Sequence, residues 1–267
     1  MNRKANKVVA VANQKGGVGK TTTAVNLSAC LADSGCHVLL VDMDPQGNAT
    51  SGLGVDRDDL QASIYDVLSG EATIDEATVP TAHDTLWVVG STTDLAGAEI
   101  ELVTHPAREF KLRTAFAQMK RRYDFVILDC PPSLGLITVN AMAAATTVLV
   151  PVQTEYYALE GMGHLLRTIE LVHEHLNPDL LVEGILLTMF DGRTNLAAQV
   201  ADEVNQHFGD LVFDTVIPRN VRLSEAPSHG QPIITYDAAS KGATSYRDLA
   251  REFLARNDIE HVRLATA

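Results

Sequence analysis

A run of glycines followed by a lysine and three threonines occupies residues 13–23, Asn-Gln-Lys-Gly-Gly-Val-Gly-Lys-Thr-Thr-Thr. Glycines let backbone N–H groups wrap around a phosphate, and the positive end of a following helix favours the same charge. In this pattern Lys20 is expected to neutralise the outer phosphates of a nucleotide, and the Thr21 hydroxyl to bind Mg²⁺. The strict pattern has glycine where this chain has Gln14, and a further lysine, Lys15, follows it. A flexible glycine turn is the alternative, but Gly-Lys-Thr-Thr in register favours a phosphate-binding loop.

Three acidic residues follow apolar runs that are expected to be strands. Asp42 and Asp44 are two residues apart where one run ends, and Asp129 ends another. Carboxylates at the carboxyl ends of parallel strands face the ligand crevice of such sheets, where they can order Mg²⁺-bound water or an attacking water. Asp129 has the form of a Walker B aspartate, which supports Mg²⁺ near the phosphates. Asp44-Pro45 also fits an ordinary turn, so its interpretation depends on the glycine loop.

These side chains require a sheet that brings several strand ends together. Apolar β-rich runs alternate with amphipathic stretches along nearly the whole chain, and several runs are apolar on both faces. This pattern is typical of parallel strands covered by helices on two sides, and it predicts a doubly wound α/β fold with a mostly parallel sheet. The expected strands are Lys7–Ala12, His37–Asp42, Leu86–Val89, Phe125–Asp129, Thr147–Val152, Ile185–Met189 and Val212–Ile217. The expected helices are Thr21–Ala32, Glu109–Arg122, Leu159–His175, Leu196–Phe208 and Ser245–Ala255.

The chain shows no internal repeat, low-complexity tract or Gly/Ser linker, so one domain over residues 1–267 is expected, without a separate N-terminal DNA-reading domain. The acidic, turn-rich segment Asp56–Asp84 is expected to be a peripheral excursion, and Asn257–Ala267 a frayed tail. The short basic N-terminus lacks the pattern of a signal peptide. The uncharged stretch Cys130–Thr154 is long enough to span a bilayer, but prolines interrupt it, which predicts a loop, a short helix and a buried strand.

Composition narrows the function classes. With 46% hydrophobic and 21% charged residues, the chain is neither disordered nor collagen-like. Its net charge of −13, from 34 acidic and 21 basic residues, argues against nucleic-acid binding, although it does not exclude a small basic patch formed by folding or dimerisation. The three cysteines, Cys30, Cys36 and Cys130, lack metal-ligand spacing and favour buried thiols in a reducing cytosol.

Taken together, the motifs resemble one family. Lys-Gly-Gly-Val-Gly-Lys-Thr-Thr at 15–22, Asp-Met-Asp-Pro-Gln-Gly-Asn at 42–48 and Leu-Asp-Cys-Pro-Pro at 128–132 are similar to the deviant Walker A ATPases of the ParA/MinD group. More narrowly, Thr-Met-Phe-Asp-Gly-Arg-Thr at 188–194 and Ile-Pro-Arg-Asn-Val-Arg-Leu-Ser-Glu-Ala-Pro-Ser at 217–228 resemble the small chromosomal ParA proteins of the Soj type. The resemblance covers about residues 7–255 and implies a P-loop NTPase fold that hydrolyses ATP.

The resemblance also implies roles for individual residues around ATP and Mg²⁺. Thr21 and, through water, Asp129 would hold Mg²⁺, with Asp42 supporting its shell. Asp44 matches the residue that orients the attacking water. Lys15 matches a signature lysine that reaches across a nucleotide-sandwich dimer and stabilises charge on the transferring phosphoryl group. The residues expected to hold the phosphates are Lys15, Gly16, Gly17, Val18, Gly19, Lys20, Thr21 and Thr22, and those expected to cradle the adenine are Pro218 and Asn220.

Two arginines are expected to bind DNA by the same resemblance. Arg193 and Arg222 match positions where Soj-type proteins contact duplex DNA nonspecifically, through phosphates and therefore with strong salt dependence. Solvated surface arginines are the alternative interpretation. Because two per subunit are few, an ATP-dependent homodimer presenting both sets is required. The most basic stretch, Lys111–Arg122, is expected to be a solvated helix face and is the next candidate for DNA.

The function implied is an ATP-dependent partitioning ATPase of the cytoplasm and nucleoid. Its ATP-bound dimer would bind nonspecific DNA, and a ParB-like centromere-binding protein would stimulate slow hydrolysis and release. A MinD-type ATPase that cycles on a membrane is the alternative. It needs a basic amphipathic C-terminal helix, whereas Arg251–Ala267 mixes charges and has one Phe. An iron–sulfur carrier on the same fold would need a cysteine pair, which the second half of the chain lacks.

Overall fold

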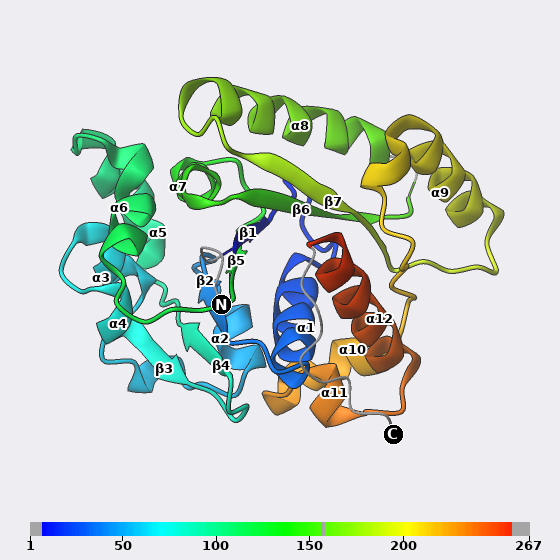
Figure 1. The fold of residues 1–267 in the computed structure, drawn as a ribbon, viewed down its shortest axis with the longest axis horizontal. Coiled ribbons are helices and arrows are strands. Elements are labelled where there is room, and N and C mark those ends of the chain that lie inside the picture. Colours follow the sequence, from blue (N-terminus) through cyan, green and yellow to red (C-terminus); the bar gives the residue numbers. More distant parts are fainter. Residues whose placement is uncertain (1–6, 156–157, 258–267) are drawn as a thin grey trace.

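The computed structural model describes residues 7–155 and 158–257. The strands among these residues form one seven-stranded sheet (Figure 1). The strand order is β3-β4-β2-β5-β1-β6-β7, and every pairing is parallel except that of β3 with β4. The predicted doubly wound, mostly parallel α/β fold is confirmed. The strands are β1 (Lys7–Val11), β2 (Val38–Asp42), β3 (Thr78–Pro80), β4 (Leu86–Val89), β5 (Phe125–Asp129), β6 (Thr147–Gln153) and β7 (Leu181–Thr188).

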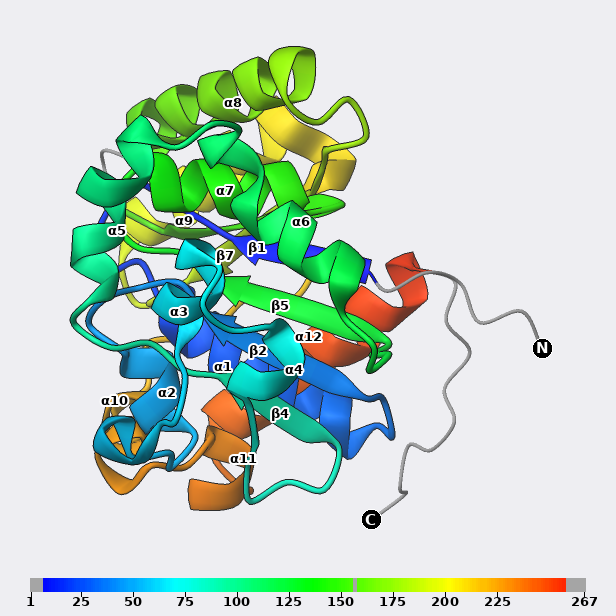
Figure 2. The same ribbon diagram turned by 90° about the vertical axis from the view of Figure 1, so that its left-hand side faces the viewer.

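Helices cover both faces of the sheet. In Figure 1, α7 and α8 lie above the strands β6 and β7, whereas α1 and α12 lie below them, and the turned view of Figure 2 agrees. The helices are α1 (Lys20–Asp33), α2 (Asn48–Gly52), α3 (Ile64–Ser69), α4 (Ile74–Ala77), α5 (Leu95–Glu101), α6 (Lys111–Gln118), α7 (Leu136–Ala144), α8 (Ala158–His175), α9 (Asn195–Phe208), α10 (Val221–Glu225), α11 (Ile233–Tyr236) and α12 (Lys241–Arg256).

Two hydrophobic cores follow from the alternation of side chains along each strand. On β1, Val8 and Ala10 belong to the core under α7 and α8, and Val9 and Val11 belong to the core under α1 and α12. Successive side chains of a strand point to opposite faces, so a strand buried on both faces must be apolar throughout. Burying apolar surface contributes about 25 cal/mol per Å², which makes these two cores the main source of stability.

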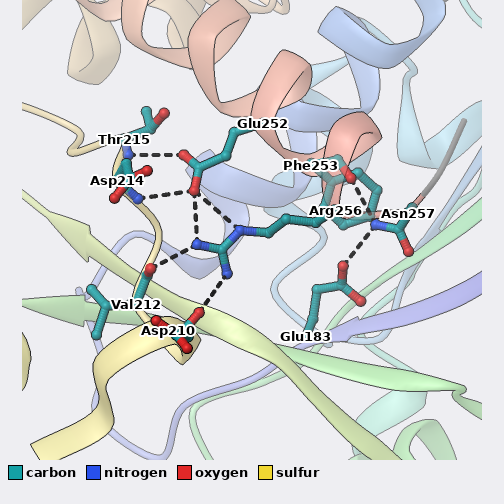
Figure 3. A network of polar contacts seen from close by, with 9 residues as sticks. All are labelled: Glu183, Asp210, Val212, Asp214, Thr215, Glu252, Phe253, Arg256 and Asn257. Atoms are coloured by element: carbon teal, nitrogen blue, oxygen red, sulfur yellow. Dashed lines mark hydrogen bonds and ion pairs between the residues drawn. The ribbon is translucent and has the colours of Figure 1, made fainter. Parts of the chain in front are cut away.

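One expected strand is absent. Val212–Ile217 forms one isolated bridge to β7, between Val212 and Ile185, and a second bridge joins Pro218 to Phe190 just beyond the two segments. Figure 3 shows the reason: the backbone N–H groups of Asp214 and Thr215 donate to the Glu252 carboxylate of α12, each at 2.9 Å, instead of to a neighbouring strand. The guanidinium of Arg256 donates to the carbonyl oxygens of Asp210 and Val212 in the same network. The segment is β-rich in sequence, and the N–H groups of Phe213 and Ile217 do donate to carbonyl oxygens of β7. Those of Asp214 and Thr215 go to α12 instead, so no continuous ladder forms.

The strand β7 begins at Leu181, four residues before the expected Ile185. Its first half contains Glu183 and Gly184, which break the apolar pattern. Glu183 forms an ion pair with Lys7 at 2.6 Å. A Cβ atom at Gly184 would lie 2.5 Å from the Phe213 ring, so this position has no room for a side chain.

The segment Asp56–Asp84 is not peripheral, contrary to expectation. It contains α3, α4 and the antiparallel strand β3, and Ile64, Leu68 and Ile74 are fully buried in the core. Its Ser, Thr and Asp residues, which suggest turns in the sequence, act as helix caps: Ser63 and Thr73 each form a capping box.

Two further expectations concern helices. The expected helix Glu109–Arg122 ends earlier, at Gln118, since Met119 is already extended. The stretch Cys130–Thr154 forms a loop, α7 and β6, as predicted. Among the described residues no helix combines the length and the apolar character that crossing a bilayer demands. The N-terminal residues 1–6 and the expected tail beyond Asn257 lie outside the described residues.

Candidate nucleotide-binding site

The glycine loop connects the end of β1 to the start of α1, as the sequence predicts. Gly17 and Gly19 have φ angles of 74° and 86°, a left-handed conformation that glycine adopts at little cost. Gly19 is the N-cap of α1 and supplies no side-chain hydrogen bond, and the first turn of α1 carries no acidic residue. The N–H groups at this helix end are therefore available to an anion, which the helix dipole also favours.

Neighbouring strands hold the loop in place. The buried Asn13 donates from its amide to the Pro151 carbonyl at 2.8 Å and accepts from the Lys15 N–H at 3.0 Å. The hydroxyl of Thr188, the last residue of β7, donates to the Val18 carbonyl at 2.8 Å. Asn13 and Thr188 could not be identified as loop anchors from the sequence, because their partners are more than 130 residues away.

The expected phosphate-binding lysine, Lys20, is buried at the start of α1. Its ammonium donates to the Lys15 carbonyl at 2.9 Å, across the loop. Burial lowers the pKa of Lys20, while the carboxylates of Asp129 and Asp44 oppose this shift. The side chain is thus a buried cation held over the glycine loop.

Asp42 and Asp129 lie on adjacent parallel strands in direct register. Asp42 is fully buried and accepts three hydrogen bonds, from the Asp44 N–H and from the N–H and hydroxyl of Thr50. Burial raises the pKa of Asp42 to about 6, against the opposing effect of the Thr50 bonds. These bonds make Asp42 a brace for the loop that begins at Met43.

Asp129 has the opposite environment. It is fully buried, and within residues 7–155 and 158–257 no donor reaches hydrogen-bonding geometry with either of its carboxylate oxygens. Burial and the nearby Asp42 raise the pKa of Asp129 well above its ordinary value, and the Thr21 hydroxyl beside it opposes the shift. A buried carboxylate without donors is costly and is suited to a cation.

Mg²⁺ fits this position. In the part of the chain that the structure describes, no three His, Cys, Asp or Glu side chains converge as a metal cage. Mg²⁺ commonly uses one or two protein oxygens and takes its remaining ligands from substrate phosphates and water. The Thr21 hydroxyl and the Asp129 carboxylate beside the glycine loop are such a pair.

Asp44 follows Asp42 in the loop after β2. The side chain is buried, and its Oδ1 accepts a hydrogen bond from the Gln46 N–H at 2.9 Å. Asp44 also acts on Lys20 as a nearby charge, so the two side chains share one site. The structure therefore brings together the loop lysine and all three predicted acids.

Lys15 is arranged differently from Lys20. Its ammonium forms an ion pair with Glu155 at 2.9 Å, and both side chains are partly exposed, by 39% and 48%. Glu155 follows β6, so this pair also lies at the carboxyl edge of the sheet. The sequence does not reveal Glu155, since nothing local marks a glutamate as the partner of a residue 140 positions away.

The two expected adenine residues line a cavity next to the glycine loop. Pro218 and Asn220 lie on the wall of a cavity of about 460 Å³, together with Gly19, Thr22 and Tyr246. Asn220 also caps α10, because its side-chain oxygen accepts from the Arg222 N–H at 2.8 Å. The cavity has the size and the mixed lining of a small-molecule site.

The two predicted DNA-binding arginines are exposed but already paired. Arg193 is 87% exposed and forms a two-pronged contact with Asp191, with distances of 2.7 and 2.8 Å. Arg193 holds the pKa of Asp191 at about 2. Arg222 is 54% exposed and contacts Glu225 at 2.8 Å and Asp237 at 3.5 Å.

These two arginines come from segments that are tied to each other. The Phe190 N–H donates to the Ile217 carbonyl, and the Arg219 N–H donates to the Phe190 carbonyl. The basic stretch 111–122 belongs to α6 and to the turn before β5, so its last residues lie at the opposite, amino end of the strands. There Asp75 accepts hydrogen bonds from the N–H groups of Lys120 and Arg121.

The sheet order, the glycine loop before α1 and the aspartates at the strand ends define a nucleotide-binding α/β protein of the P-loop class. A family model described as an AAA domain matches residues 6–182. The sporulation initiation inhibitor protein Soj of Bacillus subtilis is 58% identical over 93% of this chain and 98% of its own. The chromosome partitioning protein ParA of Myxococcus xanthus is 56% identical over 94% and 89%. The chain belongs to the ParA/Soj family of chromosome-partitioning ATPases.

A solved structure that carries a different name has the same fold. Cobyrinic acid a,c-diamide synthase from Mycobacterium smegmatis, crystallised with an ATP analogue and magnesium, is 40% identical and superimposes with a TM-score of 0.83. The alignment covers 95% of this chain and 96% of that one.

Proposed function

We propose that this protein is an ATP-dependent DNA-partitioning ATPase with its core at about residues 7–255. The observation that carries the proposal is Asp129, a buried carboxylate beside Thr21 and the glycine loop that accepts no hydrogen bond from the described part of the chain. Relatives named for chromosome partitioning, and a structural neighbour that holds an ATP analogue and magnesium, support the same assignment. The protein would act in the cytoplasm on the nucleoid.

ATP binding would use the loop from Lys15 to Thr22. Its backbone N–H groups and the Lys20 ammonium would hold the phosphates, and the cavity lined by Pro218 and Asn220 would accept the adenine. Thr21 and Asp129 would hold Mg²⁺, which neutralises charge on the phosphates when bound.

Hydrolysis would depend on Asp44 and Lys15. Asp44 is buried next to Lys20, where its free oxygen can accept a hydrogen bond from an attacking water and orient it. Lys15 would act on the nucleotide of a second copy in an ATP-bound homodimer, stabilising charge on the transferring phosphoryl group. To do so it must leave Glu155, and because this ion pair is exposed, its loss costs little.

DNA binding would exchange carboxylates for phosphates at Arg193 and Arg222. Each arginine is exposed and is already held by acidic neighbours, so duplex phosphates can replace partners of the same charge. One subunit offers few such groups, which explains why a chain of net charge −13 would need the dimer. A ParB-like centromere-binding protein would then stimulate slow hydrolysis and release the dimer.

The test is binding to random-sequence duplex DNA, with and without ATP, over a salt series, using Asp44→Ala to preserve the nucleotide. We expect binding that requires ATP and falls steeply with salt. Liposomes run in parallel test the alternative MinD-type function. Lipid binding without DNA binding would favour that alternative and reject the partitioning proposal, and a monomeric Asp44→Ala protein with ATP would contradict the role given to Asp44.

A further inference from the structure

The side chain of Arg57 contacts the loop that carries Asp44, in addition to the brace that Asp42 provides. Its guanidinium donates to three backbone carbonyl oxygens, those of Pro45 at 2.9 Å, Gln46 at 2.8 Å and Ser91 at 3.0 Å. The first two acceptors directly follow Asp44, and Ser91 lies just beyond the end of β4. Arg57 therefore ties the Asp44 loop to the sheet.

Gly47 leaves the space that Arg57 occupies. A Cβ atom at Gly47 would lie 2.4 Å from the Arg57 Nε and 2.6 Å from its Cζ, closer than any real contact. Gly47 also has a φ of 65°, in the left-handed region. The guanidinium thus lies directly against Gly47, and a side chain at position 47 would displace it.

The residue that anchors Arg57 also anchors Asp42. The Ser91 N–H donates to the Thr50 hydroxyl at 3.0 Å, and that hydroxyl donates to Asp42 at 2.7 Å. The two backbone groups of Ser91 therefore fix both acids of the 42–44 pair, Asp42 through Thr50 and the loop of Asp44 through Arg57.

We propose that Arg57 is a positioning residue for ATP hydrolysis, a role that rests on the function proposed above for Asp44. Arg57 contacts the loop and not the site of the phosphates, so its loss should slow the chemical step and leave nucleotide binding intact. Arginine is required because its planar group carries five donors in a fixed fork, whereas a lysine ammonium is a point charge with no such fork to span the three carbonyls. A misplacement of about 1 Å in a catalytic group can cost about 100-fold in rate.

The experiment compares Arg57→Lys and Arg57→Gln with the wild-type protein. We expect the kcat for ATP to fall at least ~10-fold in both variants, while the Kd for a non-hydrolysable ATP analogue stays within about twofold. Hydrogen–deuterium exchange of the peptide 43–48 should become faster. The matched control is Arg247→Lys, which alters another arginine that donates to a backbone carbonyl, that of Ala238, and should change none of the three readouts.

Gly47→Ala tests the contact between the Arg57 guanidinium and the loop by changing the loop instead of the arginine. It can replace an Arg57 variant that does not fold. It keeps the guanidinium but displaces it, so we expect the same loss of kcat without loss of analogue binding.

Wild-type kcat and exchange in Arg57→Lys would overturn the inference, as would an equal fall in analogue affinity. Hydrolysis that is lost in Asp44→Ala but intact in both Arg57 variants would overturn this inference alone. Absence of hydrolysis in the wild type, or full hydrolysis in Asp44→Ala, would overturn the proposed function and the role of Arg57 with it.

Discussion

Two sets of cationic side chains at the carboxyl edge of the sheet differ in how the protein holds them. Lys20 is buried, donates to a loop carbonyl and faces the buried acids Asp129 and Asp44. Arg193 and Arg222 are exposed and are paired with carboxylates at the surface, those of Asp191 for Arg193 and of Glu225 and Asp237 for Arg222. The first arrangement is preorganised for one small ligand, whereas the second can exchange partners with solvent. We infer that nucleotide affinity is set by few strong contacts and DNA affinity by several weak ones.

The largest expected effect is on nucleotide binding. Lys20→Ala should weaken ATP binding by at least ~100-fold, because hydrogen bonds to charged groups in a buried site contribute up to about 3 kcal/mol. Titration with a fluorescent ATP analogue measures the change. An ATP affinity of Lys20→Ala within threefold of the wild type would contradict the inference that few strong contacts set nucleotide affinity.

Asp129→Asn tests how much the buried carboxyl group of Asp129 lowers the stability of the folded protein. The substitution should raise the free energy of unfolding of the nucleotide-free protein at pH 7 by about 1–3 kcal/mol, since it removes a buried charge without donors. When folding raises the pKa of a carboxyl group, the contribution of that group to the stability of the folded protein is fully present below the pKa it has in the unfolded chain. The contribution is lost as the pH rises through the pKa it has in the folded protein. The gain should therefore shrink near pH 4.

Urea denaturation at both pH values measures this difference. Asp179→Asn, at an exposed aspartate before β7, is the matched control and should leave the stability unchanged. Mg²⁺-dependent ATP hydrolysis should also be lost in Asp129→Asn. A variant that keeps full Mg²⁺-dependent hydrolysis would remove Asp129 from the metal site.

Replacing one DNA-binding arginine should reduce DNA affinity less than Lys20→Ala reduces ATP affinity, and the losses from several arginines should add. Replacing Arg193 and Arg222 by Ala removes four cations per dimer, which should lower the slope of log K against log salt by about 3.6 and reduce DNA affinity at least ~10-fold near 0.1 M salt. ATP affinity should stay within twofold. Arg167→Ala with Arg251→Ala is the control pair, because these exposed arginines also pair with a nearby acid, in each case three positions away. An unchanged slope would mean that Arg193 and Arg222 do not bind DNA and would make residues 111–122 the next candidate.

The smallest expected effect is an increase in DNA affinity. Asp191→Asn frees Arg193 from its two-pronged partner and should raise ATP-dependent DNA affinity about twofold, in keeping with the small contribution of exposed ion pairs. The gain should disappear in the Arg193→Ala background. A loss of affinity would mean that Asp191 orients Arg193 for DNA rather than competing with it.

Much of the fold and of the nucleotide site could be predicted from the sequence. Apolar β-rich runs identify most of the strands. The Gly-Lys-Thr sequence at the start of α1 and the acids at the ends of β2 and β5 are local signals for the nucleotide site. Arg57, Thr50, Glu155 and Thr188 could not be predicted in the same way, because each acts through a partner on another element. Their residue types are ordinary for surface or turn positions.

By itself, the sequence determined which residues carry chemistry, since a glycine loop and strand-end carboxylates work through local backbone geometry. Only the tertiary structure decided which of them are braced and which are free. Asp42 and Asp129 are both aspartates at the ends of adjacent strands, yet Asp42 accepts three hydrogen bonds and Asp129, among the described residues, accepts none. The physical reason is that hydrogen-bond donors reach a buried carboxylate from segments distant in the chain, as Glu252 likewise reaches Asp214 and Thr215.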